Sequence, residues 1–145
     1  MKVTIEKEEK YKEPEIIVRC DEINDTLQDI ISYIGIAGKN IIGQLEGKTF
    51  FIPLQDIFYF ESVDNSVFIY TQKQVFKSTA KLYILEEQLA ETPFARISKN
   101  TILNLRKLQS VRPVKNARLE GTLLNGEKTV ISRQYVQGIK RNLGV

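Results

Sequence analysis

The chain has 145 residues, 42% of them hydrophobic, which suffices for one globular domain with or without a short extension. It contains one cysteine and no histidine, so an intrachain disulfide, a Cys/His zinc site and nucleophilic pairs with a histidine base are excluded. The net charge of +3 is uneven: residues 1–45 hold six Lys/Arg and nine Asp/Glu, whereas residues 96–145 hold eleven Lys/Arg and two Glu. This segregation favours a polyanionic partner for the C-terminal half.

The N-terminus is charged and lacks the apolar core of a signal peptide. No run of about 18 apolar residues, the length needed to span a bilayer, occurs in the sequence. We therefore expect a cytoplasmic protein. The single Cys20 fits a reducing compartment, and we expect it to be a small buried residue.

Residues 1–44 are predicted to form a small β-β-α extension. Residues 2–9 alternate apolar and charged side chains, which is typical of a half-exposed strand, and residues 13–20 read as a second short strand. From residue 21, isoleucines and leucines recur every three or four residues, which predicts a helix that Gly35 can end. We interpret this acidic extension as a candidate surface for dimerisation or for another partner.

Residues 45–145 are predicted to form a mostly β, α+β domain. Turn chemistry stands at Glu46-Gly47, at Asp64–Ser66 and at Asn125-Gly126, each between segments rich in β-branched and aromatic residues. Two further short helices are predicted, over residues 80–92 and 132–145; Tyr135, Ile139 and Leu143 share one face of the second. The pattern as a whole indicates many short strands with little helix.

The segment FARISKNTILNLRKLQSV, residues 94–111, carries four cations and no acidic residue. Its apolar positions predict that Ile97, Ile102, Leu103 and Leu105 are packed inside. The intervening residues 98–100 are then a loop open to a ligand. The four cations then need no acidic partner in the chain, because the expected counter-charge is a phosphate backbone, with Arg106 and Lys107 alternatively only solvated.

The residues for catalysis are scarce. Neither common glycine-rich phosphate loop is present, and the pair Glu86-Glu87 on a predicted helix is interpreted as a solvated face. Asp56 and Glu61 flank a predicted strand, and their spacing alone leaves a hydrolytic carboxylate pair open. We expect a protein that is not an enzyme, with no cofactor, no metal and no small-molecule substrate.

The residues for nucleic-acid recognition are plentiful. After position 95 the cations are mixed with Asn, Gln, Ser and Thr, as in Lys99-Asn100-Thr101 and Ser132-Arg133-Gln134. Arg and Lys contact phosphates or guanine, while Asn and Gln bond adenine edges. No helix-turn-helix pattern is visible, so reading by loops or strand ends is expected. The aromatic residues lie away from the basic cluster, which favours duplex DNA over an RNA-binding sheet.

Three blocks of this sequence together resemble the LytTR family of bacterial DNA-binding domains. They are LQDIFYFESVDNSVFIYT, FARISKNTILNLRKLQSV and NGEKTVISRQYVQGIKRNL, and the resemblance covers roughly residues 45–145. It implies an elongated fold of about ten strands that binds direct repeats in promoter DNA through loops in successive major grooves. It also implies a stand-alone member without a receiver domain, which binds double-stranded DNA as a homodimer. Such a member can have a small membrane protein as a partner.

The resemblance implies which residues contact DNA. The base contacts would come from three loops, with Asn65 and Ser66 in the first, where other members often have a histidine. The full set of expected base contacts is Asn65, Ser66, Lys99, Asn100, Arg133 and Gln134, and the expected phosphate contacts are Lys77, Arg96, Lys107 and Lys115. Ser132 is a candidate cap of the final helix, and Tyr135 is expected in the core. The alternative function is a protein-interaction module whose basic face docks an acidic partner or a membrane-associated protein.

Overall fold

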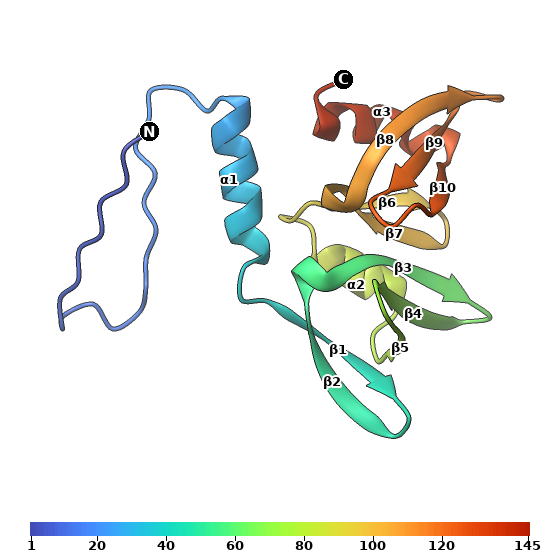
Figure 1. The fold of residues 1–145 in the computed structure, drawn as a ribbon, viewed down its shortest axis with the longest axis horizontal. Helices are drawn as coiled ribbons and strands as arrows, with labels where there is room; N and C mark the ends of the chain where they lie inside the picture. Colours follow the sequence, from blue (N-terminus) through green and yellow to red (C-terminus); the bar gives the residue numbers. More distant parts are fainter.

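The fold is described from a computed structural model that covers residues 1–145, with every side chain except that of Ser32. Ten strands and three α-helices follow one another along the chain (Figure 1). In order they are α1 (Asp25–Ile36), β1 (Asn40–Leu45), β2 (Lys48–Pro53), β3 (Ile57–Val63), β4 (Ser66–Thr71), β5 (Val75–Ser78), α2 (Leu82–Gln88), β6 (Phe94–Ser98), β7 (Thr101–Asn104), β8 (Leu108–Val114), β9 (Arg118–Leu123), β10 (Lys128–Ile131) and α3 (Arg133–Leu143). Two short 3-10 turns, Leu54–Asp56 and Leu105–Lys107, precede β3 and β8.

The strands form two antiparallel sheets. The larger has seven strands in the order β2-β1-β5-β4-β3-β7-β6, and the smaller has three in the order β10-β9-β8. Strands that are adjacent in sequence are mostly joined by tight hairpins. The turns Glu46-Gly47 and Asp64-Asn65 both have positive φ at two successive residues, as a type I′ hairpin turn requires. The mostly β fold and these two turns confirm the prediction.

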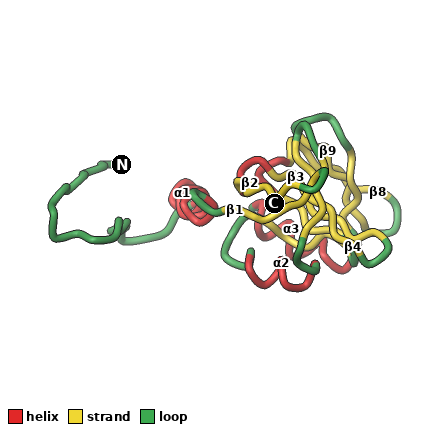
Figure 2. Tube along the Cα trace, turned by 90° about the horizontal axis from the view of Figure 1, so that it is seen from below, coloured by secondary structure: helices red, strands yellow, loops and turns green.

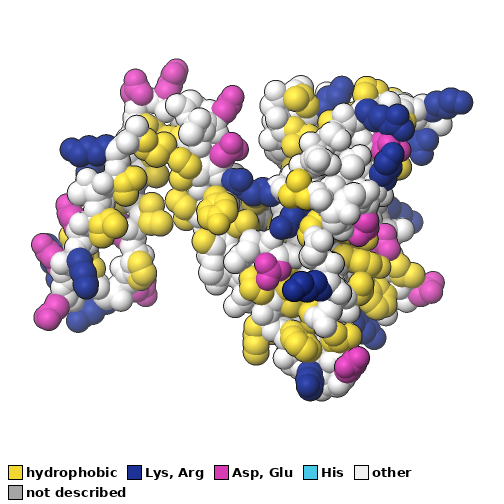
Figure 3. Space-filling view, viewed as in Figure 1, with side chains coloured by type: hydrophobic (Ala, Val, Ile, Leu, Met, Phe, Trp, Pro, Cys, Tyr) yellow, Lys and Arg dark blue, Asp and Glu magenta, His cyan; other side chains and the backbone are white. Residues whose placement is uncertain are grey.

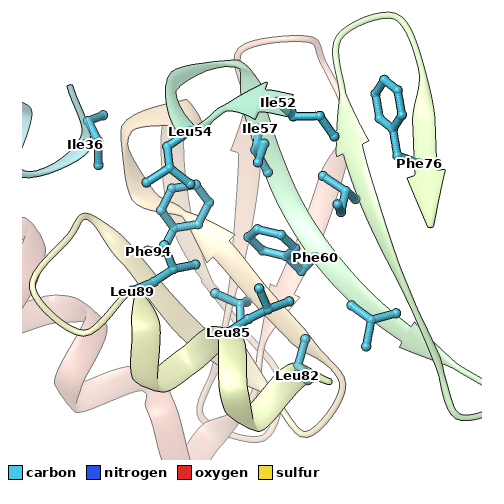
Figure 4. Packing of buried hydrophobic residues seen from close by; sticks show 13 residues of the cluster. Ile36, Ile52, Leu54, Ile57, Phe60, Phe76, Leu82, Leu85, Leu89 and Phe94 are labelled. Carbon is cyan, nitrogen blue, oxygen red and sulfur yellow. The ribbon is translucent and has the colours of Figure 1, made fainter. Parts of the chain in front are cut away.

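Each face of the large sheet supports its own hydrophobic core. On one face Phe60 and Ile102 pack with Leu85 and Leu89, which α2 and its end supply (Figure 4). On the other face the neighbouring residues Phe58 and Leu103 pack against the three-stranded sheet and α3. Because successive side chains of a strand point to opposite faces, β3 and β7 are buried on both sides. These two strands are therefore the rigid centre from which the turns project.

The predicted division of the segment 94–111 into packed and open positions is confirmed. Ile97, Ile102 and Leu103 are buried, and Leu105 is half-buried against the second core. The shared face of the final helix is confirmed as well, since Tyr135, Ile139 and Leu143 all contribute to that core.

The two strands predicted at residues 2–9 and 13–20 are wrong for the isolated chain. Residues 1–24 run as two extended arms without any strand pairing, and every residue from 1 to 26 is exposed. Cys20, predicted to be buried, is exposed and free. Figures 1 and 2 show this segment projecting beyond α1, away from both sheets. A strand needs a neighbour to bond its backbone, and no described part of the chain supplies one.

Helix α1 is shorter at its start and longer at its end than the sequence predicts. Its N-cap is Asn24, whose side chain accepts a hydrogen bond of 2.9 Å from the N–H of Leu27. Gly35 lies inside the helix, and the left-handed Gly38 follows the end instead. Ile36 is buried in the first core, and β1, which the expected division after residue 44 cuts, pairs with β2 and β5. The extension is thus anchored to the sheet through its last residues.

Candidate nucleic-acid interface

Three segments far apart in sequence meet at one end of the sheet. They are the β3–β4 turn, the β6–β7 turn and the first turn of α3. The N–H of Ser62 donates to the carbonyl of Asn100 at 2.8 Å, which joins the β6–β7 turn to β3. The N–H of Ser132 donates to the carbonyl of Ile97 at 2.8 Å, which joins the start of α3 to β6. The two hairpins point to the same side of the molecule (Figure 1).

The six residues predicted to contact bases all lie in these three segments. Asn65 is exposed at the tip of the β3–β4 turn with φ of 66°, and the half-buried Ser66 begins β4. Lys99 and Asn100 form the exposed tip of the β6–β7 turn, and the exposed pair Arg133-Gln134 forms the first two residues of α3. The structure therefore assembles the predicted set along one edge.

A lysine that the sequence analysis missed belongs to the same edge. Lys81, which precedes α2, donates from its Nζ to the carbonyl of Asn65 at 2.6 Å. The predicted Lys77 is exposed nearby on β5, where it pairs with Phe68 of β4. The signal available in the sequence was the second lysine of KSTAK, four residues after Lys77 and directly before a predicted helix.

The cations of segment 94–111 are expected to need no acidic partner in the chain, but Arg96 has one. Its Nη2 and Nε lie 3.2 and 3.4 Å from the two carboxylate oxygens of Glu86 on α2. Its Nη1 donates to the carbonyl of Lys99 at 2.6 Å. Only 15% of the Arg96 side chain is exposed. The Arg96 guanidinium therefore holds the β6–β7 turn against α2. Glu86 is exposed, as predicted, although it also pairs with Arg96.

Arg106 and Lys107 lie at the opposite end of β7 from the β6–β7 turn. Arg106 donates to the carbonyl of Asp29 in α1, and its guanidinium lies 5.4 Å from the centre of the Tyr33 ring. The Lys107 ammonium lies 5.0 Å from the centre of the Phe58 ring. The Arg106–Tyr33 and Lys107–Phe58 contacts are cation–π interactions within the chain. Lys107 is thus separated from the other predicted phosphate contacts.

The three-stranded sheet adds a second basic region. Lys115 is exposed in the β8–β9 turn, where its carbonyl accepts a hydrogen bond of 3.1 Å from Arg118. On the strands, the Oε1 atom of Glu120 lies 2.8 Å from Nε of Arg112 and 3.8 Å from Nζ of Lys128. The hydrogen bond from Arg112 lowers the pKa of the Glu120 carboxyl below its ordinary value. One carboxylate facing two cations leaves a positive surface, and Figure 3 shows Lys and Arg gathered on this side.

The final helix meets the interface through its first turn. Ser132 stands at the N-cap as predicted, but among the described residues its hydroxyl accepts no hydrogen bond from the helix. Tyr135 is half-buried against the second core, as expected. The backbone N–H groups and the dipole at the start of α3 carry partial positive charge, which adds to the charge of Arg133. The geometry suits an anionic ligand.

Comparison with known proteins identifies the fold and its family. Residues 47–144 match the LytTr DNA-binding domain family. The chain belongs to this family. The LytTr DNA-binding domain of a Bacillus cereus protein described as a methyl-accepting/DNA response regulator has a similar fold, with a TM-score of 0.69 at 19% identity, covering 74% of this chain and 100% of that one. The family is therefore one of DNA-binding domains.

Two curated relatives extend the comparison. The sensory transduction protein LytT of Enterococcus faecalis is 32% identical over 102 residues, which is 70% of this chain but 42% of that protein. An uncharacterised HTH-type transcriptional regulator of Staphylococcus aureus strain MSSA476 is 29% identical over 147 residues, covering 100% of this chain and 99% of the relative. Although the name of the S. aureus relative contains HTH, for helix-turn-helix, strands separate the three helices of this LytTR chain from one another.

None of the helices among the described residues is both long and apolar enough to cross a membrane. The described part of the chain also holds no group of three or more His, Cys, Asp or Glu side chains placed to hold a metal ion.

Proposed function

We propose that this LytTR protein is a sequence-specific transcription regulator that reads promoter direct repeats with turns inserted into the major groove. One observation carries the proposal. The β3–β4 turn, the β6–β7 turn and the start of α3 meet at one edge and expose the residue types that read base edges. The name of the S. aureus relative, a transcriptional regulator aligned over its nearly full length, supports the regulatory role.

The proposed contacts divide into two groups. Asn65, Ser66, Lys99, Asn100, Arg133 and Gln134 read bases, because they lie at the tips of the three segments. Lys77 and Lys115 contact phosphates on either side, and Lys81 joins them beside the β3–β4 turn. Phosphate contacts set the position of a protein on the duplex, and base contacts set the sequence it prefers. The proposed site of action is the cytoplasm, and two copies act together on neighbouring repeats.

A band-shift titration on the DNA upstream of the protein's own gene tests the proposal. We expect a specific complex that survives excess competitor DNA, with affinity that falls by about 0.9 log unit per phosphate contact for each tenfold rise in salt. Arg133→Ala should weaken this complex by about 1–3 kcal/mol if Arg133 makes a bidentate base contact. Arg141→Ala is the matched control, since Arg141 is exposed in the last turn of the same helix.

Two results would contradict the proposal. If no upstream fragment is bound even at low salt, the protein is not a promoter-binding regulator. If the Arg133→Ala and Arg141→Ala variants bind DNA with the same affinity, the start of α3 does not contact the DNA bases.

A further inference from the structure

The second arm of the N-terminal segment exposes a run of β-branched residues. Ile16, Ile17 and Val18 are 68%, 63% and 42% exposed, although such residues are most often buried. The backbone of residues 13–22 forms no backbone–backbone hydrogen bond with any described residue. An extended segment with apolar side chains and free backbone groups is a template for pairing with another strand.

The same arm lines an open hollow beside α1. The hollow has a volume of about 930 Å³. It is bordered by residues 1–6 of the first arm, by Ile16–Val18 of the second arm and, from α1, by Leu27, Ile30 and Ile34. Figure 3 shows hydrophobic side chains on the facing surfaces of the arm and of α1. A two-stranded ribbon is marginal alone in water but becomes stable when it packs on a helix. Helix α1 thus provides a support for a strand pair formed by the arm.

We propose that the partner of this arm is a second copy of the same chain, paired antiparallel to it around a two-fold axis at Ile17. The sequence EIIVR, residues 15–19, is self-complementary in this register. Glu15 lies opposite Arg19 of the second copy, and the symmetry repeats this pair at the other end. Ile16 lies opposite Val18 of the second copy, and both are on the same face of the ribbon. Opposite charges and β-branched pairs directly across are the pairs that stabilise antiparallel strands.

Neighbouring registers are less favourable. Moving the axis to Val18 places Glu15 opposite Asp21, two like charges, and Ile17 opposite Arg19. Moving it to Ile16 places Glu15 opposite Ile17. Pro14 has no N–H and limits the ladder on the N-terminal side, so the pairing segment is short and its register is set by the charges. An isologous contact of this kind closes as a dimer and does not propagate.

This inference concerns association of the protein without DNA. It does not rest on the proposed function and fails separately from it, because the measurement uses no operator.

Exchange of the charges at positions 15 and 19 of the 145-residue chain tests the register. Sedimentation velocity across a concentration series should show a monomer–dimer equilibrium for the natural sequence. Glu15→Arg and Arg19→Glu should each raise the dimer dissociation constant about tenfold or more, because each places two like-charged pairs across the axis. The double variant Glu15→Arg/Arg19→Glu should restore dimerisation, since it only exchanges the two sides of each pair.

Disulfide cross-linking locates the axis. In the proposed register the Cα atoms of the two Ile17 residues are about 5 Å apart, within reach of a disulfide. The two Cys20 residues are about 20 Å apart, six strand positions, and out of reach. Under mild oxidation the variant Ile17→Cys/Cys20→Ser should therefore form a covalent dimer rapidly. The natural protein and Ile23→Cys/Cys20→Ser should not, although Ile23 is as exposed as Ile17.

A monomer at every concentration would overturn the proposal and leave the arm to a different protein, such as a small membrane partner. A dimer that the single charge variants leave unchanged, or that the double variant does not restore, would overturn this register. Deletion of residues 1–22 is the control for folding, because it spares the Asn24 cap and the buried Ile36. The deleted protein should be a folded monomer.

Discussion

The guanidinium of Arg96 forms a two-point salt bridge with the carboxylate of Glu86, and it also binds the carbonyl of Lys99. The bridge connects α2 to the β6–β7 turn across ten residues of sequence. A charge that sequence analysis assigns to DNA phosphate is instead used within the protein to fix the turn that carries Lys99 and Asn100. We therefore expect Arg96 to affect DNA binding by positioning this turn.

Glu86→Gln should weaken DNA binding even though it removes a negative charge. Without the carboxylate, Arg96 loses its two ionic contacts, and the β6–β7 turn is less well held. If Arg96 contacted phosphate directly, freeing it from Glu86 would leave the affinity unchanged or raise it. Band-shift titrations of the two proteins at one salt concentration separate these outcomes.

Arg96→Met provides the complementary measurement. It keeps much of the length of the side chain, removes the bonds to Glu86 and Lys99, and should destabilise the fold by about 1–2 kcal/mol. The slope of log affinity against log salt should change by clearly less than 0.9, the value for one lost phosphate contact. A change of about 0.9 would show that Arg96 contacts the DNA backbone.

Lys99 and Lys107 should differ in their effect on DNA binding, although both lie in the segment 94–111. Lys99 is at the exposed tip of the β6–β7 turn, whereas Lys107 lies over the Phe58 ring at the other end of β7. Lys99→Ala should cost about 1–3 kcal/mol of binding free energy, and Lys107→Ala should cost less than about 0.5 kcal/mol. Equal losses in the two variants would place both ends of β7 on the DNA.

The strands and turns were predictable because their signals are local. Asp64-Asn65 adopts the two positive φ values that its residue types favour, and the apolar positions Ile97, Ile102 and Leu103 are buried as their spacing indicates. The resemblance carried by three sequence blocks located the three segments of the candidate interface. What joins these segments, such as the bond between Ser62 and Asn100, depends on the sheet order and is not visible in any one segment.

The unpredicted features are contacts between distant parts of the chain. The partners of Arg96 and Arg106 come from α2 and α1, and nothing in the sequence around either arginine identifies them. The strands predicted for residues 2–9 and 13–20 are absent for a related reason. Alternation of apolar and charged residues shows that a segment can pair as a strand, but pairing requires a neighbour that the isolated chain lacks.

Asn104 should be essential for stability although it lies at the end of β7 opposite the β6–β7 turn. It is 1% exposed, its side-chain amide donates to the carbonyl of Ile57 at 2.9 Å, and its carbonyl accepts from the N–H of Arg106 at 3.1 Å. Asn104→Ala removes the side-chain partner of both backbone groups and should lower the free energy of unfolding by about 2–3 kcal/mol. Urea denaturation with an unchanged m-value would show this. The exposed Asn142→Ala should change stability by less than about 0.5 kcal/mol.

Two stacked tyrosines connect the large sheet to the β9–β10 turn and make the fold sensitive to alkali. The rings of Tyr59 and Tyr70 lie 4.3 Å apart between centres, and the Tyr59 hydroxyl donates to Glu127 at 3.0 Å. Burial raises the pKa of Tyr59 well above its ordinary value, and the hydrogen bond to Glu127 raises it further. Burial also raises the pKa of Tyr70, with a further contribution from Glu61. Both hydroxyls therefore stay protonated in the folded protein at pH values where free tyrosine ionises.

The stability of the protein should fall as the pH rises above about 10, the ordinary pKa of tyrosine. Below that pH both states keep the Tyr59 proton, and the stabilisation is complete. Above it the unfolded chain loses the proton while the folded chain keeps it, so each further pH unit favours unfolding. Tyr59→Phe should lower stability slightly at pH 7, through the lost bond to Glu127, and should reduce the slope of stability against pH between about 10 and 11. Urea denaturation of both proteins across this range measures the slopes, and equal slopes would contradict the raised pKa of Tyr59.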